Sequence, residues 1–121
     1  MDGARNGTHP ARDHIPKDIL LCDWHYHLHP SYPSVDQFEQ AGFDYVVCGW
    51  RKPRAVDALL RYAFEHGEEH LQGCLATNWY GGERELDYLI DGKAESDQIR
   101  AAGECFRRSM RAVSAGTVPR S

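Results

Sequence analysis

Three short apolar runs recur along the chain and predict buried β-strands. They span Asp18 to Trp24, Tyr45 to Cys48 and Leu71 to Ala76. The first contains the uninterrupted run Ile19 to Cys22, which is typical of a strand covered on both faces. The runs therefore favour a parallel sheet with helices packed on it.

Helical patterns follow each apolar run. Ser34 to Gln37 has the form of a capping box and predicts a short helix that stops at Gly42. Pro53 suits the first turn of a second helix. The apolar positions of that helix recur at helical spacing and are Val56, Leu59, Leu60, Ala63 and Phe64. Ser96 is expected to cap a final helix, in which Gly103 lowers the helix propensity. The apolar positions expected there are Ile99, Ala102, Phe106, Met110 and Val113.

Strands that alternate with helices predict an α/β fold with the order β-α-β-α-β-α and parallel strands. A weak internal repeat supports this order, because Cys22-Asp23-Trp24, Cys48-Gly49-Trp50 and Cys74 follow one another at a spacing of 26 residues. That spacing is close to the roughly 30 residues of one unit of a TIM (β/α)8 barrel. We therefore expect a parallel β-α-β-α-β-α segment of such a barrel, incomplete in this chain.

The length of 121 residues fits one domain. We expect a disordered lead-in over residues 1–16, a partial barrel domain over 17–114 and a frayed C-terminus over 115–121. The four cysteines form no C-x-x-C pair and are expected to be buried and reduced.

The charge balance is 14 Lys and Arg against 18 Asp and Glu, without a dense basic cluster, so nucleic acid is not an expected partner. No apolar run approaches the roughly 20 residues that span a bilayer, and the N-terminus lacks the apolar core of a signal peptide. A membrane partner is therefore not expected, and the expected location is cytoplasmic.

All three tryptophans, Trp24, Trp50 and Trp79, fall at or just after a predicted strand end. In parallel α/β folds these ends form the ligand face. Indole rings pack well on the apolar face of a sugar. Neighbouring residues that could hydrogen-bond its hydroxyls are Asp23, His25, Tyr26, Arg51, Thr77, Asn78 and Tyr80. The alternative that the tryptophans only fill the core stays open.

The segments that carry these residues resemble a known family. They read KDILLCDWHYH, GFDYVVCGWRKP and GCLATNWYG, within roughly Ile15 to Gly82. They are similar to the last strands of the catalytic barrel in family-20-type glycoside hydrolases, the β-N-acetylhexosaminidases, and in particular to a little-characterised bacterial branch. The resemblance implies that Trp24, Trp50 and Trp79 enclose an N-acetylhexosamine and that Tyr26 adds a hydroxyl. We expect no metal or other cofactor.

One family feature is missing. The family has an adjacent Asp-Glu pair, in which the glutamic acid protonates the leaving oxygen and the aspartate steers the substrate acetamido group. No strand end in this sequence carries such a pair. The adjacent acidic residues Glu68-Glu69 follow a helix stop instead. We therefore assign no catalytic residue. The chain is expected to be the C-terminal part of such an enzyme, as a fragment, a split gene product or a degenerate remnant. It should be inactive alone and is expected to need a partner that supplies the rest of the barrel.

The histidines support a competing hypothesis. His25, His27 and His29 alternate after the first strand, and D-x-H-x-H also looks like the first metal-binding strand of amidohydrolase-type enzymes. There, His25 and His27 would bind a metal ion that activates water. The other strand ends offer no further ligands, and Arg51 is a poor neighbour for a cation. A non-catalytic α/β module is the third possibility.

Overall fold

The computed structural model describes residues 7–79 and 82–118, which form one parallel three-stranded sheet with helices. The strands are β1 (Leu20–Trp24), β2 (Asp44–Gly49) and β3 (Leu71–Ala76). They lie in the order β1-β2-β3, and both neighbouring pairs are parallel. The helices are η1 (His9–His14), α1 (Pro33–Ala41), α2 (Pro53–His66), α3 (Glu83–Asp91) and α4 (Asp97–Ala115). The expected alternation and the parallel pairing are confirmed.

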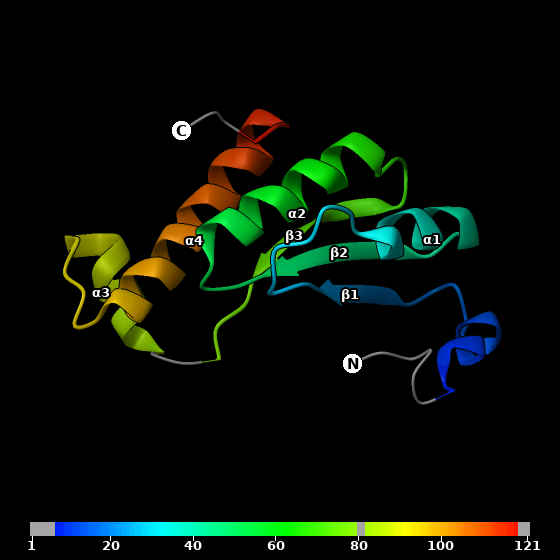
Figure 1. Cartoon of the computed structure of the whole chain (residues 1–121), viewed down its shortest axis with the longest axis horizontal. Helices are drawn as coiled ribbons and strands as arrows, with labels where there is room; N and C mark the ends of the chain where they lie inside the picture. Colours follow the sequence, from blue (N-terminus) through cyan, green and yellow to red (C-terminus); the bar gives the residue numbers. More distant parts are fainter. Residues whose placement is uncertain (1–6, 80–81, 119–121) are drawn as a thin grey trace.

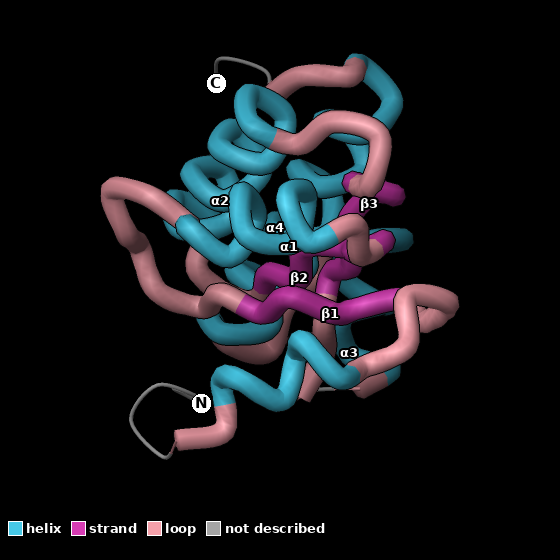
Figure 2. The backbone as a smooth tube through the Cα atoms, turned by 90° about the vertical axis from the view of Figure 1, so that its right-hand side faces the viewer, coloured by secondary structure: helices cyan, strands magenta, loops and turns pink. Residues whose placement is uncertain are grey.

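Helices α1, α2 and α4 form one layer against one face of the sheet. Figure 1 shows α2 and α4 side by side across the strands, with α3 against the first half of α4, and Figure 2 shows the strands to one side of this layer. The main core lies between the layer and the sheet. Its buried members are Tyr32, Val35, Tyr45, Val47, Val56, Leu59, Leu60, Ala63, Cys105 and Ala112. The apolar face expected for α2 is confirmed.

The other face of the sheet is open at β1, which corrects the expectation that β1 is covered on both sides, whereas on β2 this face is buried at Val46 and Cys48. Leu20 and Trp24 are each 55% exposed, and Cys22 between them is also exposed. Only Leu21 and Asp23, which point toward the helices, are shielded. The apolar run could not reveal this difference, because burial of the second face depends on what packs there. Cys22 is likewise an exception to the expectation that all cysteines are buried.

Helix α4 begins as expected, because Ser96 Oγ accepts a hydrogen bond from the Ile99 amide at 3.2 Å. Its buried face agrees with the expected one at Ile99 and Ala102 and differs further along the helix. Large residues expected to be buried are exposed, namely Phe106, Met110 and Val113. The buried positions are Ile99, Ala102, Gly103, Cys105, Ser109 and Ala112. Most of these are small, which allows α4 to pack closely against its neighbours.

The capping box expected at Ser34 is wrong. Helix α1 begins at Pro33 with Tyr32 as its N-cap, and no side chain caps it. Proline fits this first position because it lacks the amide hydrogen that would otherwise need a partner. The Ser34 hydroxyl donates instead to Asp23 Oδ2 at 2.7 Å.

Part of the expected lead-in is ordered. Residues 9–14 form the 3-10 helix η1, from which Arg12 donates to Gln37 of α1 at 2.8 Å. Residues 1–6 and 119–121, within the lead-in and the frayed end that we expected, lie outside the described residues, as does Tyr80. Over the described ranges, no helix has both the length and the apolar character needed to cross a membrane.

Candidate functional site

Four aromatic side chains meet at the carboxyl end of the sheet. Trp24 stacks on Tyr26 with ring centroids 6.3 Å apart and lies 6.1 Å from Trp79. Tyr26 in turn lies 5.6 Å from Trp50. These four residues, here called the aromatic cluster, come from three chain segments. The convergence expected for the tryptophans is therefore present, with Tyr26 as the link between Trp50 and the other two.

The Tyr26 hydroxyl holds the cluster together. It accepts a hydrogen bond from Trp79 Nε1 at 2.5 Å and lies 3.0 Å from Thr77 Oγ1. These contacts fix the Trp79 ring although it is 63% exposed. The two outer indoles are thus oriented and accessible at once, which a ligand-binding surface needs and a core does not.

Backbone contacts beyond the strands bring the segments to this edge. The His25 amide donates to the Cys48 carbonyl at 3.1 Å, and the Thr77 amide donates to the Gly49 carbonyl at 2.9 Å. Gly49 also lets α2 approach, because a Cβ there would lie 2.8 Å from Val56 Cγ2. Gly49 thus allows the close contact with α2, and the next residue, Trp50, lies in the aromatic cluster.

Asp23 and His25 lie on the helix side of the sheet, away from the aromatic cluster. His25 Nε2 lies 2.9 Å from Asp23 Oδ1 and 2.8 Å from Ser34 Oγ, and Tyr32 packs edge-on against the His25 ring at 5.0 Å. The carboxylate and the hydroxyl share one ring nitrogen, whereas a Ser-His-Asp triad uses opposite nitrogens. This arrangement therefore joins β1 to α1. The sequence placed these residues beside the sugar site because it could not show their partners.

The other two histidines also have separate surroundings. His27 Nδ1 lies 3.0 Å from Lys52 Nζ, and the His29 ring packs against Tyr32 at 5.8 Å. An ammonium group next to His27 opposes metal binding there. Within residues 7–79 and 82–118, no group of three or more His, Cys, Asp or Glu side chains could hold a metal ion. The His-x-His hypothesis gains no support from these positions.

Burial raises the pKa values of several groups in the core and on α3. Burial raises the pKa of the Cys48 thiol to about 12 and that of Cys105 to about 12, so both thiols stay protonated and unreactive. Burial also raises the pKa of Glu85, which is 8% exposed. Its Oε1 has no hydrogen-bond partner in the described part of the chain. Glu85 was not singled out from the sequence, where it reads as an ordinary charge in the first turn of α3.

Arg107 and Arg108 of α4 are half-buried. Arg108 pairs with Asp57 of α2, and Arg107 lies over the Tyr88 ring of α3 at 4.7 Å. Both therefore connect α4 to neighbouring helices.

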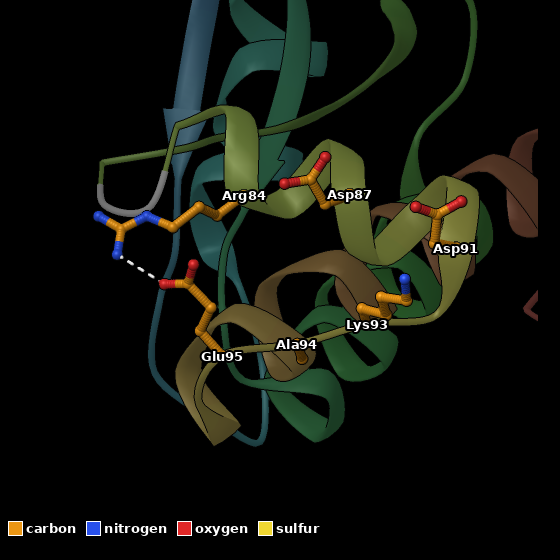
Figure 3. Close-up of a pocket in the computed structure, with 6 residues that line it drawn as sticks. All are labelled: Arg84, Asp87, Asp91, Lys93, Ala94 and Glu95. Carbon is orange, nitrogen blue, oxygen red and sulfur yellow. Dashed lines mark hydrogen bonds and ion pairs between the residues drawn. The ribbon is translucent and has the colours of Figure 1, made fainter.

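A larger cavity lies away from the aromatic cluster, between α3 and the start of α4. It has a volume of about 440 Å³ and contains no aromatic side chain. Figure 3 shows its charged lining, in which Arg84 points toward Glu95 at 3.0 Å. The lining residues are Arg84, Asp87, Asp91, Lys93, Ala94 and Glu95. A much smaller cavity of about 100 Å³ adjoins Tyr26 and Trp50.

Comparison with known proteins adds no family. No family model matches the chain, and no curated protein matches it.

Proposed function

We propose that the aromatic cluster binds a sugar ring, as the carbohydrate-binding part of a β-N-acetylhexosaminidase-like glycoside hydrolase. The observation that carries this proposal is the meeting of Trp24, Tyr26, Trp50 and Trp79 from three segments at one sheet edge. The resemblance of the same segments to family-20-type hydrolases favours an N-acetylhexosamine as the ligand.

The exposure of the rings supports binding rather than core packing. Trp24 and Trp79 are 55% and 63% exposed, so an incoming ring would remove indole surface from water.

The arrangement of the sheet supports the proposal that the three units belong to a TIM barrel. The strands follow one another in sequence order with the helices in one layer, as in a barrel wall. The open sheet face and the unpaired edges of β1 and β3 are surfaces that further strands of a barrel would cover. The exposed stripe of α4, formed by Phe106, Met110 and Val113, lies where another helix would pack. We propose that further strand-helix units, on a separate chain or on a longer one, occupy these surfaces.

The sugar proposal is tested by following the indole N–H signals of the ¹⁵N-labelled chain by NMR. N-acetylglucosamine or its β-1,4 disaccharide should shift the signals of the three tryptophans. Trp79→Ala should weaken binding by about three- to tenfold, the effect of losing roughly 0.7–1.4 kcal/mol of aromatic contact. Phe106→Ala is the matched control, because it removes an exposed ring from α4, which contributes nothing to the cluster.

A millimolar affinity corresponds to about 4 kcal/mol, so sugar at about 50 mM should nearly saturate the site. Unchanged indole signals at that concentration would refute the proposal. A circular dichroism spectrum of the same sample must show a folded chain. Equal losses in Trp79→Ala and Phe106→Ala would also count against the cluster as the binding surface.

A further inference from the structure

The small cavity beside the aromatic cluster is unusually basic. Its lining residues are Tyr26, His27, Trp50, Arg51 and Lys52, around a volume of about 100 Å³. Three of these five side chains carry basic nitrogen atoms. Tyr26 and Trp50 belong to the aromatic cluster as well, so the cavity and the proposed sugar surface share a wall.

The two cations in this wall have no carboxylate partner. The Arg51 guanidinium lies over the Trp50 ring at 4.3 Å, and Lys52 Nζ contacts His27 Nδ1 at 3.0 Å. Because an ammonium group only donates, this imidazole nitrogen is an acceptor, and His27 neutralises no charge. Over residues 7–79 and 82–118, neither Arg51 nor Lys52 forms an ion pair with a carboxylate.

Arg12, Arg84 and Arg108, by contrast, each pair with a carboxylate. Acidic residues outnumber basic ones by 18 to 14, and the large cavity beside α3 places Arg84 against Glu95. Two adjacent unpaired cations over a cavity create a local positive potential in an otherwise acidic protein. An anion would supply acceptors to both side chains.

We propose that this basic cavity binds an anionic substituent of the sugar, either a carboxylate or a sulfate or phosphate ester. Arginine suits these groups because its planar guanidinium donates two parallel hydrogen bonds. The volume is about that of three liquid water molecules, each of roughly 30 Å³, which is enough for one such group. The part that concerns the sugar ring rests on the proposed function, whereas anion binding by Arg51 and Lys52 is separable from it.

The test compares charged and neutral ligands by NMR on the full chain. Glucuronic acid and glucose 6-phosphate should bind about tenfold more tightly than glucose, which corresponds to about 1.4 kcal/mol for charge-assisted hydrogen bonds. Raising NaCl from about 0.02 M to about 0.5 M should remove most of this advantage through screening. The two acids distinguish a carboxylate site from a phosphate site.

Variants locate the effect. Lys52→Met should abolish the preference for charged sugars and leave glucose binding unchanged, since Lys52 is outside the aromatic cluster. Arg51→Gln should reduce the preference as well. Lys93→Met is the matched control, because it removes a cation from the other cavity, and it should keep the preference intact.

The outcomes separate the two proposals. Equal affinity for glucuronic acid, glucose 6-phosphate and glucose overturns the anion site and leaves the proposed function standing. A preference that survives in Lys52→Met, or disappears in Lys93→Met, overturns the assignment to this cavity. Inorganic sulfate that shifts the Arg51 and Lys52 amides while no sugar shifts the indoles supports the anion site and refutes the sugar surface.

Discussion

Gly103, a poor helix former in the middle of α4, provides a sharp test of how the helices pack. A Cβ at this position would lie 2.3 Å from Tyr88 Cδ1 and 2.9 Å from Tyr88 Cε1. Ordinary carbon contacts are about 3.5–4.0 Å, so the Tyr88 ring must move by more than 1 Å to admit a methyl group. The glycine is therefore explained by the close approach of α3.

Two opposing effects set the size of the change in Gly103→Ala. Alanine favours the helix by about 0.8–1 kcal/mol over glycine. Overpacking typically costs about 1–3 kcal/mol, and displacement of Tyr88 also disturbs its contact with the Arg107 guanidinium. We expect a net decrease of about 1 kcal/mol in the free energy of unfolding, measured by urea denaturation followed by circular dichroism.

The Tyr88→Ala background reverses the expected sign. Without the ring, Gly103→Ala should stabilise the chain by about 0.8–1 kcal/mol, because only the helix propensity remains. The coupling between the two substitutions should thus be about 2 kcal/mol. If Gly103→Ala stabilised both backgrounds equally, the packing of α3 on α4 described above would be wrong.

Two further predictions concern titratable groups. The hydrogen bond to Asp44 raises the pKa of His70 in the folded chain. Protonated His70 therefore stabilises the fold at pH values below the pKa of His70 in the unfolded chain. This contribution is lost as pH rises through the raised pKa. Asp44→Asn should lower the His70 pKa in an NMR titration and destabilise the chain more at pH ~5 than at pH ~9; an unchanged pKa would contradict the contact. Exposed Cys22 should react with a thiol reagent in the folded chain, whereas Cys48 and Cys105, whose pKa values burial raises to about 12, should react only on unfolding. Peptide mapping of the labelled thiols checks this order, and rapid labelling of Cys48 would refute it.

Much of the local structure was predictable because it depends on near neighbours in the chain. The periodicity of α2 after Pro53, the cap at Ser96 and the strand from Leu71 to Ala76 all agree with the structure. The meeting of the tryptophans was also predictable, since parallel strands bring their carboxyl ends to one edge.

Contacts between distant segments were not predictable. Ser34 has the sequence of a cap, yet its hydroxyl donates to Asp23. The cavity formed with Lys52 required the loop after β1 to meet the start of α2, which no spacing in the sequence indicates.

Residues close together in the chain were enough to predict the α/β alternation and the positions of the aromatic residues at strand ends, because backbone periodicity and turn chemistry act over a few residues. Contacts between remote segments instead leave the outer face of β1 uncovered, leave Phe106 and Met110 of α4 exposed, and bring the Tyr26 hydroxyl to the Trp79 indole. Side-chain burial and hydrogen-bond partners depend on which remote segments pack against a surface. An apolar residue has the same place in the sequence pattern whether its face is buried or exposed.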